Sequence, residues 1–270
     1  MKNVLKWVGI VFVVIIVIGF IAGNGDESKS SNNNSSAAAS SKKAIKLTEN
    51  ELKSIKDTIR DDVETSFDGD SSQLDTEYLA VSAREMQKVY AGNEARGDKI
   101  YKGKKIILSG TIDSIDSSFS DIPVVTLKTG DMFNKVHVNF SKKYRDLAAE
   151  LNKNQKVKYA CVGSSVIIGS PTVRDCTPVS EAVDELTDKF VSSVNNALKN
   201  PGKASEYDKQ VILSVKIASV ATEDFKTCNV IDQKCLSSAI SKYGEDNLKN
   251  NEEIKAVMEK LGIDPVTLEI

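Results

Sequence analysis

The chain has 270 residues, 40% of them apolar, and a formal net charge of −2 from 36 basic and 38 acidic residues. This length allows one large domain or two small domains with tails, and the apolar content is sufficient for a packed core. The balanced charge gives no overall attraction to nucleic acid or to acidic lipid. Because His137 is the only histidine, a multi-histidine metal site or a histidine-based catalytic relay within one chain is nearly excluded. We expect no cofactor and no metal ion.

An apolar run at the N-terminus has the length of a membrane-spanning helix. Residues 4–23 are apolar or glycine apart from Lys6, and about 20 residues of helix cross a bilayer core. Lys2 and Lys6 lie at its start and Asp26 follows it, which directs the N-terminus to the cytoplasm by the positive-inside rule. We therefore expect residues 1–23 to form a transmembrane signal anchor in the cell membrane. This single pass inserts residues 4–23 into the lipid bilayer and leaves the bulk of the chain extracytoplasmic, in the periplasm or at the outer surface.

A cleaved signal peptide is the alternative interpretation of this segment. The apolar run is at the upper limit of length for a signal peptide, and residues 19–24 offer a poor cleavage site. No cysteine lies nearby, so a lipoprotein anchor is excluded. Both interpretations export the bulk of the chain.

A polar linker and a helical segment follow the apolar run. Residues 24–46 are dominated by Ser, Asn and Ala and cannot bury enough surface to offset their ordering entropy, so we expect a disordered linker. Residues 47–98 are predicted to form a helical lead-in. It begins with Thr48 and Glu51 at the spacing of a capping box, and a second helix fits residues 76–91.

From residue 104 the apolar pattern changes to the period of a β-strand. Five segments bounded by turn residues are typical of strands: 106–112, 124–127, 136–140, 156–161 and 172–174. A helical stretch, residues 141–151, separates the third from the fourth, and this order of elements is that of an OB-fold barrel. We therefore predict an α+β fold: a five-stranded OB-fold barrel over residues 99–177, flanked by helices, with an N-terminal transmembrane helix and a C-terminal helical region over residues 178–270.

A run of residues before and within the first strand resembles a known family. Its members are Tyr90, Asn93, Ala95, Tyr101, Lys102, Gly103, Lys104 and Gly110. Together with the later Cys161 and Cys176, they make residues 80–177 similar to the tRNA-anti-like family of bacterial OB-fold domains. The resemblance implies an exported, membrane-anchored or lipoprotein-like bacterial protein, and it transfers no catalytic or binding residue. This chain departs from the lipoprotein members because it has no lipidation cysteine.

The four cysteines, Cys161, Cys176, Cys228 and Cys235, fall into two close pairs. Neither spacing resembles the knuckle of a zinc site. We predict two disulfides, one within each pair, as is typical of an exported chain. Buried free thiols and a metal site remain the alternatives.

The C-terminal region has the pattern of several helices. Apolar side chains recur at helical spacing from Val183 to Leu198. Further helices fit residues 204–220, 232–243 and 251–261. A helical stripe usually marks a core, and we interpret these stripes as core or as a partner surface.

The chain contains no nucleophile elbow, no phosphate-binding glycine loop and no histidine-rich ligand set, and we assign no catalytic residue. We expect a non-enzymatic binding or interaction module of the bacterial envelope, whose partner is another envelope protein or an envelope ligand. An envelope hydrolase that uses carboxylates is one alternative, and it needs converging acids in a cleft.

Oligonucleotide binding by the barrel is a further alternative. Residues 99–176 hold 13 Lys or Arg against 7 Asp or Glu, but single-strand binding also needs aromatic rings for base stacking. The predicted strands carry only Phe140 and Tyr159 as aromatics, and an exported location removes most nucleic acids. We therefore do not expect a nucleic-acid partner. We interpret the lysines as a solvated face or as a patch that meets anionic lipid headgroups or a partner.

Overall fold

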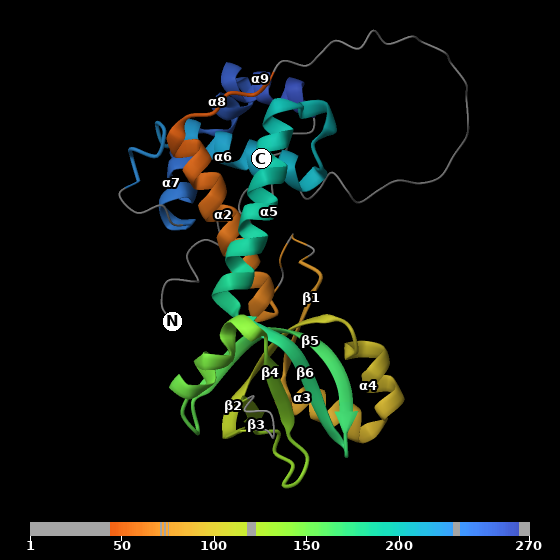
Figure 1. Ribbon diagram of the computed structural model, residues 1–270. Coiled ribbons are helices and arrows are strands. Elements are labelled where there is room, and N and C mark those ends of the chain that lie inside the picture. Colours follow the sequence, from red (N-terminus) through yellow and green to blue (C-terminus); the bar gives the residue numbers. More distant parts are fainter. Residues whose placement is uncertain are drawn as a thin grey trace, which may run out of the picture. The chain divides into compact units, whose positions relative to one another are not determined.

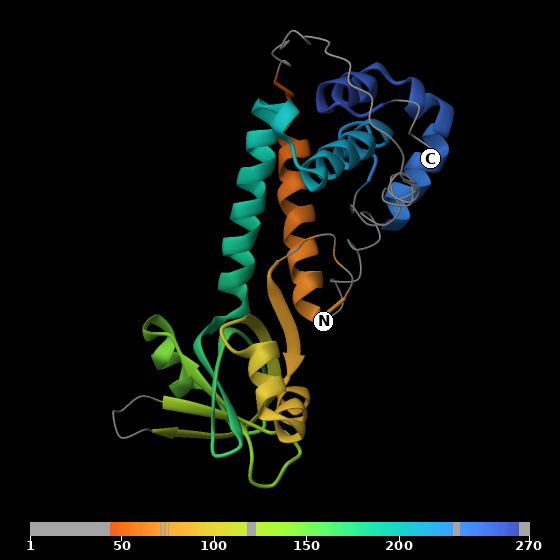
Figure 2. The same cartoon turned by 90° about the vertical axis from the view of Figure 1, so that its right-hand side faces the viewer.

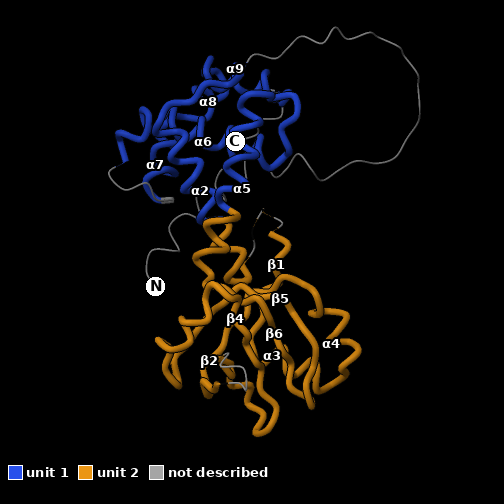
Figure 3. The backbone as a smooth tube through the Cα atoms, in the orientation of Figure 1, with its two compact units in different colours: residues 1–62, 187–270 blue, residues 63–186 orange. Residues whose placement is uncertain are grey.

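The computed structural model describes residues 44–70, 72, 74, 76–117, 123–228 and 233–264. The predicted transmembrane anchor, and the predicted linker up to residue 43, lie outside these residues. Within the described ranges, no helix is long and apolar enough to cross a membrane. The chain forms two compact units (Figure 3): a barrel unit of residues 63–186 and a helical unit of residues 1–62 and 187–270.

Five strands of the barrel unit close into a barrel (Figure 1). They are β2 (Lys105–Ser117), β3 (Pro123–Leu127), β4 (Val136–Phe140), β5 (Lys156–Ile167) and β6 (Ser170–Pro178). Neighbours follow the order β2-β3-β4-β6-β5, and β5 pairs with β2 to complete the ring. The β4–β6 pair is parallel and the other pairs are antiparallel. The predicted α+β fold with a closed five-stranded barrel of the OB type is therefore confirmed.

A sixth strand corrects the predicted helical lead-in. The sequence pattern predicts a helix over residues 76–91, but the structure has strand β1 (Tyr78–Ser82) followed by helix α3 (Ala83–Gly92). β1 pairs in parallel with the first half of β2. The helix begins where the Ser82 hydroxyl accepts the Glu85 N–H and the Glu85 carboxylate accepts the Ser82 N–H, which is a capping box. The prediction is wrong because a parallel partner is distant in the chain and leaves no local signal.

Three helical segments cover the barrel. Helix α3 packs against β1, β2, β4 and β6, and helix α4 (Glu94–Tyr101) packs against α3 and β5. Segment η3 (Lys142–Glu150) packs against β3, β4 and β6. It occupies the position of the helix predicted over residues 141–151, and its geometry is that of a 3-10 helix.

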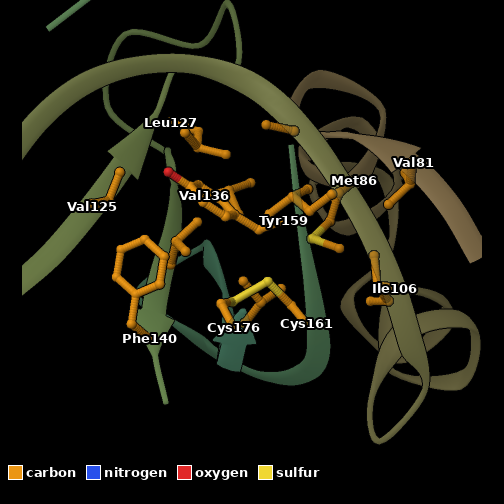
Figure 4. Packing of buried hydrophobic residues seen from close by; sticks show 14 of the residues in the cluster. Val81, Met86, Ile106, Val125, Leu127, Val136, Phe140, Tyr159, Cys161 and Cys176 are labelled. Carbon is orange, nitrogen blue, oxygen red and sulfur yellow. A yellow bond between two sulfur atoms is a disulfide. The ribbon is translucent and has the colours of Figure 1, made fainter. Parts of the chain in front are cut away.

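Apolar side chains fill the interior of the barrel (Figure 4). Val136 and Phe140 point inward from β4, Val125 from β3 and Ile106 from β2, and Met86 reaches them from α3. The alternation of buried and half-buried residues along β4 is the period-two pattern expected from its sequence. Because the interior is a packed core, any ligand of the barrel would bind to its outer surface or to its loops.

The turn between α4 and β2 approaches β5 very closely. Gly103, at φ +73°, donates its N–H to the Gly163 carbonyl at 2.9 Å, and the Gly163 N–H donates to the Lys104 carbonyl at 2.9 Å. A Cβ atom on Gly163 would lie 1.9 Å from the Tyr101 carbonyl oxygen. Only glycine leaves room for this approach, which fixes α4 against the barrel.

The helical unit is arranged around helix α6 (Figure 2). It combines parts of α2 (Glu49–Asp68) and α5 (Val179–Lys199) with η4 (Pro201–Lys203), α6 (Glu206–Ala221), α7 (Gln233–Tyr243), α8 (Glu245–Asn250) and α9 (Glu252–Leu261). Helix α6 is buried over most of its length and packs against α7, α8 and α9. The helices predicted over residues 204–220, 232–243 and 251–261 are confirmed.

The predicted capping box at the start of α2 is confirmed, and it also holds a buried lysine. The Glu51 N–H donates to Thr48 Oγ1 at 3.1 Å, and the Thr48 N–H donates to Glu51 Oε2 at 2.8 Å. Lys216 Nζ lies 2.6 Å from Glu51 Oε1 and 3.2 Å from Glu253 Oε2. Burial by itself lowers the pKa of Lys216, but the hydrogen bonds and charges of the two glutamates outweigh this effect and raise it. These ion pairs join α2, α6 and α9.

Replacement of Gly163 by alanine tests the close approach of α4 to β5. We expect Gly163→Ala to lower the free energy of unfolding by about 2 kcal/mol. The added methyl group would clash with the Tyr101 carbonyl oxygen, which belongs to the backbone and cannot move aside easily. Urea denaturation followed by circular dichroism measures the change. Gly92→Ala is the matched control, because no atom lies within 4 Å of a Cβ there. Equal denaturation midpoints for Gly163→Ala and the wild type would contradict the packing argument.

Candidate functional site

The family-motif residues build the connection between α3 and β2. Tyr90 on α3 and Tyr101 on α4 are buried, with their ring centroids 5.9 Å apart. The Asn93 side chain accepts the Arg96 N–H at 3.0 Å and so caps α4. Gly97 leaves space for the Tyr90 ring, because a Cβ there would lie 2.3 Å from a ring carbon.

The remaining motif residues serve the turn and the first barrel strand. Lys102 forms an exposed ion pair at 3.2 Å with an aspartate one helical turn before it. Gly110 lies under the Leu127 side chain, which a Cβ would approach to 2.9 Å. Ala95 and Lys104 are exposed. The motif that carries the family resemblance therefore specifies the fold of this turn and does not converge on a ligand site.

Both predicted disulfides are present. Cys161–Cys176 links β5 to β6 within the barrel core, where both residues are buried (Figure 4). Cys228–Cys235 links the segment after α6 to α7. The first bond closes a loop with a sequence separation of 15, which is worth about 3 kcal/mol in the chain-entropy model.

The aromatic residues of the barrel strands belong to the core. Phe140 and Tyr159 are buried and meet edge to face, with ring centroids 4.9 Å apart. Burial raises the pKa of Tyr159 to about 12. Base stacking requires an exposed ring, so neither residue provides a stacking platform. Among the aromatic residues that the structure describes in the barrel unit, Phe133 alone is exposed.

The single histidine, His137, is half-buried on β4. His137 Nδ1 lies 3.3 Å from Thr126 Oγ1. Burial lowers the pKa of His137, and the charge of Asp116 partly opposes this shift. In the described part of the chain, no three His, Cys, Asp or Glu side chains are grouped so that they could hold a metal ion.

Two loops at one end of the barrel expose large apolar side chains. We call these four residues the apolar tip: Met132 and Phe133 in the β3–β4 loop, 81% and 83% exposed, and Ile167 and Ile168 at the β5–β6 turn, 58% and 95% exposed. The loops lie side by side at the lower end of the barrel in Figures 1 and 2, where the Lys135 N–H donates to Ser170 Oγ at 3.3 Å. Single exposed apolar residues are ordinary, but four on adjacent loops form a patch typical of an interaction site.

Polar contacts inside the β3–β4 loop hold Met132 and Phe133 outward. Asp131 Oδ1 accepts the Phe133 N–H at 2.7 Å and the Asn134 N–H at 2.8 Å. Thr129 Oγ1 donates to the Asn134 carbonyl at 2.7 Å and accepts the Asp131 N–H at 3.1 Å. The backbone hydrogen bonds lower the pKa of Asp131 because they stabilise its charged form. The loop is therefore a preorganised turn that presents its two apolar side chains to the solvent.

The β5–β6 turn carries an unfavourable residue at its most exposed position. Ile168 and Gly169 are its two central residues, with φ values of +48° and +74°. Positive φ at both positions is typical of a type I′ hairpin turn, which favours Asn-Gly. A β-branched residue is strained in this left-handed region. Neither burial nor backbone preference accounts for an isoleucine at this position.

Three basic side chains lie on or beside the β3–β4 loop, and we call them the basic rim: Arg84, Lys128 and Lys135. Arg84 extends from α3 to this loop. Lys128 is exposed at the start of the loop, and its Nζ donates to Asn154 Oδ1 at 2.6 Å. Lys135 Nζ donates to the Asp131 carbonyl at 2.7 Å and lies 3.7 Å from Asp113 Oδ2. Three cations thus lie close to two carboxylates, so the surroundings of the tip have a small positive excess.

A polar cleft of about 1380 Å³ lies in the helical unit, lined mainly by α7, α8 and the start of α9. Its side chains are largely engaged in the fold. Asn251 caps α9 and donates to the Tyr243 hydroxyl at 3.2 Å. Glu252 and Glu253 lie 3.5 Å and 3.2 Å from lysine Nζ atoms. We therefore regard the apolar tip as the stronger candidate site.

The sequence analysis did not identify the apolar tip. The available signal was the presence of Met-Phe and Ile-Ile within turns, where Asn, Asp, Gly and Ser are usual. The two dipeptides are 34 residues apart from Phe133 to Ile167, so only the closed barrel reveals that they meet.

Ile168→Asn tests whether the tip is strained. Because asparagine tolerates a left-handed backbone and suits a type I′ turn, we expect this change to raise the free energy of unfolding by roughly 1 kcal/mol. Ile167→Asn is the matched control, because residue 167 ends a strand and gains nothing from the substitution. Thermal denaturation of both variants measures the difference. A loss of stability in Ile168→Asn would contradict the argument from strain.

His137 gives the fold a predictable pH dependence. Since burial lowers the pKa of His137 in the folded state, the unfolded chain binds the proton first as the pH falls. The free energy of unfolding should therefore decrease as the pH falls through the unfolded value of about 6.5, with no effect well above it. His137→Gln should remove this decrease, which urea denaturation between neutral and mildly acidic pH measures. Identical slopes in the wild type and the variant would contradict it.

Three comparisons with known proteins complete the description. A model of the tRNA_anti-like family matches residues 1–177. Among solved structures, the chain is similar to a lipoprotein from Klebsiella pneumoniae subsp. pneumoniae MGH 78578 that is provisionally described as nucleic acid-binding. The identity is 17%, the TM-score is 0.32, and the similarity covers 37% of this chain and 90% of that chain. No curated protein matches the sequence. Because the family model spans more than half of the chain, this protein belongs to the tRNA_anti-like family.

Proposed function

We propose that this protein is a non-enzymatic binding module of the bacterial envelope that contacts an envelope component through the apolar tip. In this proposal the N-terminal apolar segment anchors the chain in the cell membrane, and the barrel and helical units lie outside the cytoplasm. The observation that carries the proposal is the rigid exposure of four large apolar side chains on two adjacent loops of a closed barrel.

The structure of the tip favours a binding surface over apolar residues that are exposed without a role. The Asp131 and Thr129 side chains fix the β3–β4 loop with four hydrogen bonds of 2.7–3.1 Å. A preorganised surface loses little conformational entropy when it binds. Ile168 keeps an unfavourable backbone conformation in full exposure, and such strain clusters at functional positions.

The two disulfides support the extracytoplasmic placement. All four cysteines are paired, as Cys161–Cys176 and Cys228–Cys235. Disulfides persist in oxidising compartments and are rare in the cytoplasm. The apolar run over residues 4–23 and the basic residues before it are in keeping with this topology.

Particular contacts speak against the two alternatives. For a carboxylate hydrolase, the cleft offers Glu252 and Glu253, but each of these carboxylates lies in an ion pair with a lysine. For oligonucleotide binding, the strand aromatics Phe140 and Tyr159 are packed against each other in the core.

Photo-crosslinking in intact cells tests the proposal. A photoreactive phenylalanine analogue at position 133 of the full-length protein should form adducts with an envelope component, because this side chain lies at the contact surface. The same analogue at position 100 is the control, since Ile100 is also exposed on the barrel unit but lies outside the tip. Adduct yield is measured by gel shift and mass spectrometry. Equal yields at the two positions would refute an interaction through the tip.

The same cells test the topology. Without reductant, all four cysteines should resist alkylation, and the mass of the membrane-bound protein should include the N-terminal segment. Free thiols would place the chain in the cytoplasm, and a shortened mass would show that the segment is cleaved.

A further inference from the structure

We infer that the apolar tip docks onto the surface of the lipid bilayer, with the Met132, Phe133, Ile167 and Ile168 side chains in the interfacial region and the basic rim at the headgroups. The inference rests on the proposed function, because it identifies the envelope component that the tip contacts. In this inference the membrane holds the N-terminal segment and also binds the tip of the barrel.

The shape of the tip suits a membrane better than a protein interface. Its residues lie on two narrow hairpin ends and not on a broad face. A bilayer needs no shape complementarity, so two protruding loops can insert where they could not form a full protein interface.

The hydrogen bonds of the β3–β4 loop prepare its backbone for an apolar environment. A polar group that leaves water without a partner is costly, so backbone at membrane depth must be hydrogen-bonded internally. The N–H groups of Phe133 and Asn134 already donate to Asp131 Oδ1, and the Asn134 carbonyl accepts from Thr129 Oγ1. The loop can therefore bring Phe133 to the interface with its own N–H and that of Asn134 already paired.

The basic rim supplies the complementary charge. Arg84, Lys128 and Lys135 lie on or beside the β3–β4 loop of the tip. The surface of a membrane that contains acidic phospholipids attracts basic side chains close to it. Apolar side chains framed by cations are the combination typical of interfacial membrane binding.

Depth-dependent fluorescence quenching tests the inference on the full-length chain. The one native tryptophan, Trp7, is replaced by phenylalanine, and Phe133→Trp supplies a reporter in the tip. The protein is reconstituted into vesicles of phosphatidylglycerol and phosphatidylcholine, with or without acyl chains brominated near the headgroup. We expect the emission of the Phe133→Trp reporter to be blue-shifted and quenched by brominated lipid. An Ile100→Trp reporter, also on the barrel unit, should show neither effect.

A second substitution separates docking from folding. Ile168→Asp adds charge at the tip, and aspartate tolerates the left-handed backbone there, so the fold should persist while the quenching at position 133 is lost. Circular dichroism checks the fold. Replacing phosphatidylglycerol by phosphatidylcholine should also reduce the quenching, because the basic rim then lacks anionic headgroups.

The outcomes distinguish docking from anchoring. Flotation of the Ile168→Asp variant, whose tip should not dock, reports whether the N-terminal segment anchors the chain. A variant that floats, together with quenching at position 133 no greater than at position 100 in the native tip, would overturn docking and leave the anchor intact. A variant that does not float, together with quenching at position 133 in the native tip, would overturn the anchor and support docking. A blue shift at position 133 that depends on protein concentration and not on lipid would instead assign the tip to a second copy of the chain.

Discussion

The parallel pairing of β4 with β6 is the constraint on which the rest of the barrel unit depends. It joins strands that are separated in the chain by η3 and β5, and it closes the sheet into a ring. Because the two strands are parallel and nearly in register, with His137 opposite Thr172, the loops that precede them lie at the same end of the barrel. Those loops carry the apolar tip. Barrel closure therefore both buries the core and assembles the candidate site.

The residues that define the family and the residues that define the site are different. The motif residues Tyr90, Asn93 and Tyr101 shape the connection from α3 into the barrel. Gly97 leaves space for the Tyr90 ring, and Gly163 allows the turn to approach β5 closely. None of them lies in the β3–β4 loop or the β5–β6 turn. The motif thus specifies a scaffold, and loops on such a scaffold are free to carry function.

The tip combines local strain with global support. An isoleucine at positive φ is unfavourable. Large apolar side chains that stay in water also contribute no hydrophobic stabilisation to the fold. The fold tolerates this loss of stability because Ile168 lies between β5 and β6. These two strands are held by strand pairing in the closed barrel and by the Cys161–Cys176 disulfide. Natural proteins commonly break local rules at functional positions and compensate elsewhere in the fold.

Features that depend on neighbouring residues could be predicted from the sequence. Apolar runs bounded by turn residues, two of them with period-two alternation, located the five barrel strands. Helical spacing located α6, α7 and α9, and the close pairing of cysteines indicated both disulfides. The Thr48–Glu51 capping box could likewise be predicted, because its two residues are three positions apart in the sequence. The remaining features could be seen only once the chain had folded. Strand β1, the ion pairs of Lys216 and the meeting of Phe133 with Ile168 at one barrel end all depend on partners far apart in the chain. A local sequence pattern does not predict such contacts, because they form only when the strands and helices pack together.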